Sequence, residues 1–182
     1  MSERIGKDRE GTVVLPRGIT GFSHIDDPGA VDPSAPQNDL STFEKTFSNY
    51  CFTAARLLGG SVVPVEKSDS FCASFSFRVL ELRQGRVAIV LNKVYPMVAF
   101  AEPHAIQEIH SGLGGDMLLK FVESPELEDV LRSFGDYTVL TISQLHQPVN
   151  PEMCKQLSAT EVKQIKYWKP DILGHLVFQY WD

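Results

Sequence analysis

The sequence predicts a single α+β domain with a mainly antiparallel sheet, helices packed on one face and a flexible N-terminal arm. Three observations lead to this prediction. Apolar residues recur at helical spacing near residue 50, alternate with polar residues over the next segments, and return to helical spacing in the C-terminal half. Strands and helices that are segregated along a chain in this way are typical of α+β domains.

The predicted arm covers residues 1–38, and the predicted domain covers residues 39–182. The arm holds four prolines and five glycines and shows no sustained apolar period, a composition that favours loops or disorder. Residues 12–15 are apolar, and for them an edge strand, or packing against the domain, remains an alternative.

The first helix is predicted over residues 42–58. Ser41 and Glu44 have the spacing of a capping box, and Gly59 with Gly60 supplies a left-handed helix end. The apolar stripe between these signals consists of Phe43, Phe47, Tyr50, Ala54 and Leu57.

A three-stranded meander is predicted next. Residues 71–79 alternate between apolar and more polar side chains, residues 83–85 form a turn, and residues 86–91 are rich in branched side chains. A third strand follows over residues 94–101, in which Pro96 favours an edge or bulged position because proline lacks the N–H that a ladder needs.

The following elements are less regular. We expect a helical turn and a glycine loop over residues 103–115, a short strand over 117–122, and a strand over 137–145. Between the two strands, Ser124 and Pro125 open a helix that ends at Gly135. A parallel crossover is therefore permitted in this half of the chain.

The C-terminal segment contains a second capping box, formed by Ser158 and Glu161, and its helix ends before Pro170. Trp168 is expected on the buried face of that helix. Residues 172–180 fit either a helix or a strand, and the branched and aromatic residues at their end favour the strand.

Charge and cysteine usage restrict the function classes. Seventeen basic and 23 acidic residues give a formal charge of −6, which disfavours nucleic acid and anionic membranes as partners. Lys163, Lys166 and Lys169 have the spacing of a solvated helix edge. The three cysteines, Cys51, Cys72 and Cys154, are widely spaced, which predicts buried small residues and a cytoplasmic location.

A possible catalytic or metal-binding cluster consists of Glu102, His104, Glu108 and His110. His104 and Glu108 are one helical turn apart, but His110 lies well round the helix, and zinc requires three or four ligands. We therefore interpret this segment as a polar turn. The sequence predicts no cofactor and assigns no catalytic residue, and the glycines of residues 111–115 lack the lysine of a phosphate loop.

Acidic clustering indicates a protein partner. Only Arg132 offsets the five acids of residues 123–136, and a helix with its apolar stripe turned inward would present them to water. The aromatic C-terminus can also serve recognition, although core packing is its commoner use. The predicted partner-binding residues are Glu123, Glu126, Glu128, Asp129, Asp136, Tyr180 and Trp181.

Residues 161–170, Gly174 and residues 178–182 resemble the closing motif of small bacterial proteins, some of which are similar to immunity proteins encoded beside polymorphic toxins. The resemblance covers the last third of the chain, and Gln179 stands where the family pattern has Asn. It implies a non-catalytic role and carries over no site residue.

These observations predict an acidic, non-catalytic binding protein that neutralises a basic partner, such as a toxin. One alternative is a small hydrolytic or metal-dependent enzyme that uses the cluster of residues 102–110. Another is a structural homo-oligomer built through the strand near Pro96 or through the aromatic C-terminus.

Overall fold

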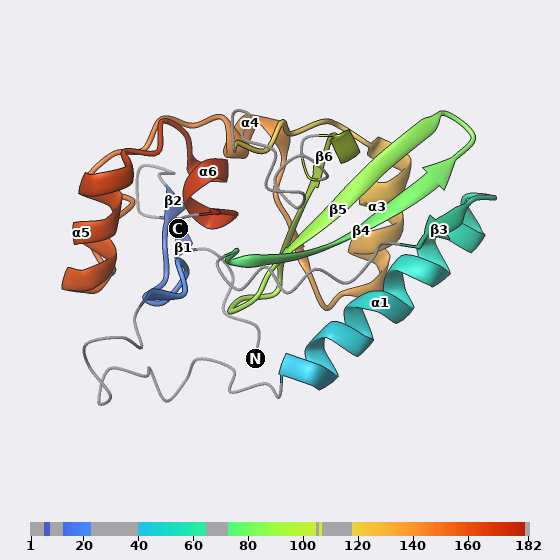
Figure 1. Cartoon of the computed structure of the whole chain (residues 1–182), viewed down its shortest axis with the longest axis horizontal. Coiled ribbons are helices and arrows are strands. Elements are labelled where there is room, and N and C mark those ends of the chain that lie inside the picture. Colours follow the sequence, from blue (N-terminus) through green and yellow to red (C-terminus); the bar gives the residue numbers. More distant parts are fainter. Residues whose placement is uncertain are drawn as a thin grey trace.

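The computed structural model describes residues 6–7, 13–22, 40–64, 73–104, 106 and 118–180. Their fold is α+β, as predicted, and its centre is a five-stranded, mostly antiparallel sheet (Figure 1). The strand order β3-β4-β5-β6-β7 follows the sequence. The strands are β3 (Ser61–Val63), β4 (Phe75–Leu82), β5 (Gly85–Asn92), β6 (Met97–Ala101) and β7 (Thr138–Val139).

Helix α1 (Leu40–Leu57) confirms the first predicted helix. Its end is a Schellman motif: Gly59 has φ 69°, and the N–H of Gly60 donates to the carbonyl of Ala55 at 2.8 Å. The predicted cap at Ser41 is wrong, because the helix already includes that residue. The Glu44 carboxylate accepts a hydrogen bond from Ser76 on β4 at 2.6 Å.

The predicted meander of β4, β5 and β6 is confirmed. The β4–β5 ladder runs from Phe75 opposite Asn92 to Leu82 opposite Gly85, and β5 pairs with β6 in the same antiparallel sense. The prediction for Pro96 is wrong. β6 begins one residue later and is an inner strand, because β7 pairs with it on its other side.

The parallel crossover exists, but it joins β6 to β7. Met97 lies opposite Thr138, and helix α3 (Pro125–Phe134) lies in the connection. The strand predicted over residues 117–122 is reduced, within its described part, to a single bridge between Ala101 and Phe121.

The strand predicted over residues 137–145 is confirmed only at β7, and the strand favoured near the C-terminus is absent. Beyond β7, the chain forms α4 (Ile142–Leu145), because Thr141 and Gln144 make a capping box. The strand favoured over residues 172–180 is replaced by α6 (Leu173–Val177). Gly174 lets α6 approach Phe121 closely, since a Cβ at this position would lie 2.3 Å from Cε2 of that ring.

The sheet is buried on both faces, whereas the sequence predicted helices on one face only. α1 and α3 cover one face, on which Leu80, Ile89 and Phe100 are buried. The other face, with Val79 and Val90, packs against α6 and the segment of residues 13–22. The alternating residues of β4 and β5 therefore belong to two different cores.

Residues 13–22 lie within the predicted arm, and the structure packs them into the second core. Val13, Leu15 and Ile19 are fully buried. Val13–Val14 forms β2, which pairs with β1 (Gly6–Lys7). Residues 13–15 therefore pack against the domain, which was one of the alternatives for this part of the arm. The boundary between arm and domain near residue 38 stays a prediction.

Helix α5 (Ala159–Trp168) holds this segment in place through a buried carboxylate. The predicted capping box is confirmed: Ser158 Oγ accepts from the N–H of Glu161 at 3.2 Å, and the N–H of Ser158 donates back at 2.9 Å. Glu161 is also fully buried and accepts from the N–H of Gly18 at 3.1 Å and from Thr20 Oγ1 at 2.9 Å. One side chain thus caps a helix and anchors residues 18–20.

Replacing Glu161 by alanine would leave several buried donors without an acceptor. We expect Glu161→Ala to lower the free energy of unfolding by about 3 kcal/mol, measured by urea denaturation. Glu161→Gln retains one acceptor oxygen and should lose less. An unchanged unfolding midpoint in the alanine variant would contradict this role.

The close packing of Gly174 predicts a second stability effect. Gly174→Ala should lower the free energy of unfolding by about 1–3 kcal/mol, because the new methyl group collides with Phe121. In the double variant Gly174→Ala with Phe121→Leu the collision is relieved. The double variant should therefore lose less unfolding free energy than the two single variants lose together. Additive losses in thermal unfolding would argue against the contact.

Candidate functional site

The acidic surface of residues 123–136 lies on and beside α3. Leu127 and Leu131 are buried against the sheet, which turns the acids of this amphipathic helix outward. Glu128 is half-buried, whereas the other four predicted acids, Glu123, Glu126, Asp129 and Asp136, are exposed.

Some of these acids have partners within the chain. Glu128 pairs with Arg132 at 2.7 Å, and Glu126 accepts a weak hydrogen bond from Gln84 at 3.3 Å. The Tyr50 hydroxyl donates to Asp136, a hydrogen bond that raises the pKa of the tyrosine. Within the part of the chain that the structure describes, Glu123 and Asp129 make no ion pair, so much of the negative charge is not neutralised.

The predicted aromatic part of the partner site lies elsewhere. Tyr180 is half-buried, forms a bridge with Ala73 and packs on the core that faces away from α3. Trp181 lies outside the described residues. The structure therefore does not bring Tyr180 together with the acids of α3.

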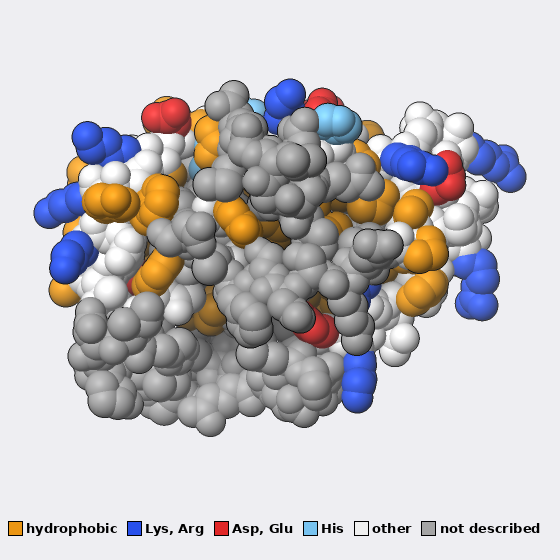
Figure 2. Space-filling view, in the orientation of Figure 1, with side chains coloured by type: hydrophobic (Ala, Val, Ile, Leu, Met, Phe, Trp, Pro, Cys, Tyr) orange, Lys and Arg blue, Asp and Glu red, His pale blue; other side chains and the backbone are white. Residues whose placement is uncertain are grey.

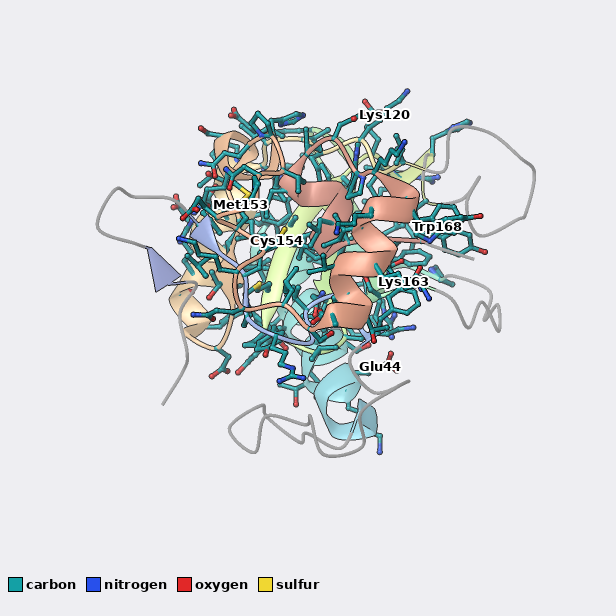
Figure 3. The ribbon with its side chains drawn as sticks, turned by 90° about the vertical axis from the view of Figure 1, so that its left-hand side faces the viewer. Glu44, Lys120, Met153, Cys154, Lys163 and Trp168 are labelled. Atoms are coloured by element: carbon teal, nitrogen blue, oxygen red, sulfur yellow. The ribbon has the colours of Figure 1, made fainter. Side chains whose placement is uncertain are left out.

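The end of the molecule formed by α5 carries the opposite charge. Figure 2 shows Lys or Arg side chains gathered over this helix, and Lys163, Lys166 and Lys169 are exposed, as their spacing predicted. In Figure 3, Lys163 lies on the same side of the molecule as Trp168 and Lys120. Acidic and basic side chains are thus concentrated on different helices.

The possible catalytic cluster is only partly described. Glu102 and His104 are exposed at the start of a helical turn, and Glu108 and His110 lie outside the described residues. Among the residues that are described, no three or more His, Cys, Asp or Glu side chains are placed to hold a metal ion.

The cysteines differ in their surroundings. Cys51 lies on the buried face of α1, and burial raises the pKa of its thiol to about 12. Cys154 is half-buried, also with a raised thiol pKa, and Cys72 lies outside the described residues. The prediction of a buried small residue is confirmed for Cys51, whose thiol is poorly disposed to ionise.

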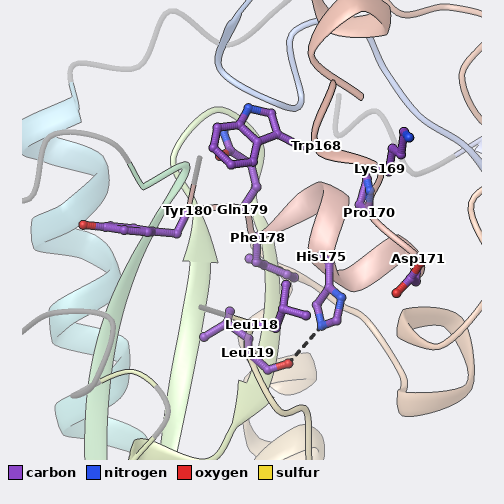
Figure 4. Close-up of a pocket in the computed structure, with 10 residues that line it drawn as sticks. All are labelled: Leu118, Leu119, Trp168, Lys169, Pro170, Asp171, His175, Phe178, Gln179 and Tyr180. Atoms are coloured by element: carbon purple, nitrogen blue, oxygen red, sulfur yellow. Dashed lines mark hydrogen bonds between the residues drawn. The ribbon is translucent and has the colours of Figure 1, made fainter. Parts of the chain in front are cut away.

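A pocket of about 320 Å³ lies where the end of α5, α6 and residues 118–119 meet (Figure 4). The sequence did not predict it. Trp168 was expected to be buried in the core but is half-buried in the pocket wall. The many aromatic residues near the C-terminus were the one feature of the sequence that could have indicated this pocket. The lining residues are Leu118, Leu119, Trp168, Lys169, Pro170, Asp171, His175, Phe178, Gln179 and Tyr180.

Local backbone geometry shapes this pocket. Lys169 ends α5 in the left-handed region, with φ 49° and ψ 57°, and Pro170 prevents the helix from continuing. On α6, His175 Nε2 lies 3.2 Å from the carbonyl of Leu119, so this nitrogen carries the proton and donates. Nδ1 is buried and has no hydrogen-bond partner among the described residues.

The chain matches no known family model, no curated protein and no solved structure. The resemblance to immunity proteins therefore stays a prediction. None of the described helices is both long enough and apolar enough to cross a membrane.

His175 should make the stability of the fold depend on pH. Burial lowers its pKa from the ordinary 6.5, against opposing effects of the Leu119 carbonyl and Asp171. The unfolded chain thus binds more protons than the folded chain as the pH falls below about 6.5, and this contribution to stability is lost with acidification. In His175→Gln the amide can still donate to Leu119 but does not titrate. The urea concentration at the unfolding midpoint should therefore change less between about pH 7.5 and about pH 5 than it does in the wild type.

If the unfolding midpoint of His175→Gln changes with pH as steeply as that of the wild type, the pocket histidine does not contribute to the pH dependence of stability.

Proposed function

We propose that this protein is a non-catalytic binding protein that holds a basic protein partner on the acidic surface of α3. In line with the resemblance of its C-terminal third, the proposed role is that of an immunity protein that neutralises a toxin. The observation that supports this proposal most is the outward row of acids on a helix that two buried leucines fix to the sheet.

The chemistry of the surface suits lysine and arginine side chains. Beside Asp136, the rings of Tyr50 and Phe134 stack with centroids 4.6 Å apart, and both residues are half-buried. The aliphatic stem of a partner's lysine or arginine can pack on these rings while its charged end reaches a carboxylate. Acids on a fixed helix also accelerate encounter with a basic protein before any contact forms.

The test uses a partner that co-purifies with the full chain from its native host at moderate salt and is then purified and identified. Glu123→Gln with Asp129→Asn removes two charges from the proposed surface. We expect the association rate constant, measured by surface plasmon resonance, to fall several-fold at low salt. The difference should shrink as salt screens the charges.

A matched control removes two charges elsewhere. Glu81→Gln with Glu152→Gln changes the net charge equally and disrupts only exposed pairs with Arg86 and Lys155, which contribute little to stability. This control should associate like the wild type. The proposal fails if nothing co-purifies or if both double variants bind equally well.

A further inference from the structure

The pocket beside α5 and α6 has the features of a small-molecule site. We propose that it binds a small, neutral, planar heteroaromatic molecule of one or two fused rings. Its volume of about 320 Å³ is at the lower end of the range of ligand pockets, which suits a ligand of this size. The proposal is independent of the partner surface on α3, since the two sites involve different elements and different cores.

The aromatic rings and the charged side chains lie on different sides of the pocket. Figure 4 shows Trp168, Phe178 and Tyr180, with Gln179 beside Trp168, toward one side and the stretch from Lys169 to Asp171 toward the other. Aromatic faces pack best against flat, apolar surfaces. Leu118 at the pocket is 47 % exposed, so a flat ring placed here would remove apolar surface from water.

The charges within the pocket favour a neutral ligand. Lys169 and Asp171 carry opposite charges, and the lowered pKa of His175 keeps its ring uncharged at neutral pH. An anion or a cation would therefore meet one attractive and one repulsive group. A ring edge that both donates and accepts hydrogen bonds complements both side chains, which is why a heteroaromatic ring fits better than a hydrocarbon.

The walls are held in place before a ligand enters. The His175–Leu119 hydrogen bond and the contact of Gly174 with Phe121 attach α6 to the segment of residues 118–121. Gln179 donates from its side chain to the carbonyl of Thr20 at 2.8 Å. A pocket with fixed walls spends little binding energy on ordering itself.

Benzimidazole is a suitable probe, because it is flat, neutral at pH 7.5, and has one N–H donor and one ring acceptor. By ligand-observed NMR with the full chain, we expect saturable binding with a dissociation constant near 1 mM, which is well within the affinity that a nine-atom ligand can reach. Benzoate and benzylamine, an anion and a cation of similar size, should each bind more weakly.

An aromatic residue of the pocket supplies the variant, and an exposed one on α1 supplies its control. Trp168→Ala removes a wall and should weaken benzimidazole binding by about tenfold or more. Phe52→Ala removes a ring that is 57 % exposed and does not line the pocket, so binding should be unchanged. Circular dichroism checks the fold, and Leu118→Ala, at a more exposed position, replaces Trp168→Ala if that variant does not fold.

Three results would overturn the proposal. They are no saturable binding of benzimidazole up to about 10 mM, an equal loss of affinity in Phe52→Ala, or tighter binding of benzoate or benzylamine than of benzimidazole. None of them bears on the acidic surface of α3, whose test measures association with a protein.

Discussion

The carboxylate of Glu161 joins α5 to the segment of residues 18–20, and the position of the helix depends on this contact. Glu161 is the buried residue of that helix, and it faces backbone N–H groups of residues 18–20. A buried carboxylate is tolerated only where oriented donors replace its water. Gly18, with φ 90°, allows the backbone to turn its N–H toward the acid. Removing either side of this contact would leave the other buried and unsatisfied.

The two faces of the sheet are stabilised in different ways, and this difference separates the two candidate sites. Under α1 and α3 the packing is apolar, with T-shaped aromatic contacts such as that between Phe47 and Tyr137. On the other face, buried amides connect distant segments: Asn92 Nδ2 donates to the carbonyls of Ile19 at 3.0 Å and Val177 at 2.7 Å. The acidic surface thus lies over the core that apolar packing stabilises. The pocket lies beside the core in which buried amide side chains also donate hydrogen bonds to the backbone.

Local sequence signals predicted the elements that local interactions determine. The helical period near residue 50, the hairpin and the exposure of the α3 acids all follow from spacing and turn residues. α4 was missed although Thr141 and Gln144 form a capping box, because branched residues there also fit a strand. α6, the buried carboxylate of Glu161 and the pocket depend on contacts between segments far apart in the sequence. Gly18 and Glu161, for example, are 143 positions apart. No period or motif records such contacts.

The docked N-terminal segment has a consequence for how the protein is made. Leu15 and Thr20 are synthesised well before their hydrogen-bond partners Met153, Glu161 and Gln179. The second core therefore cannot close until the residues up to Gln179 have been made, and before that its apolar side chains are exposed to aggregation and to chaperones.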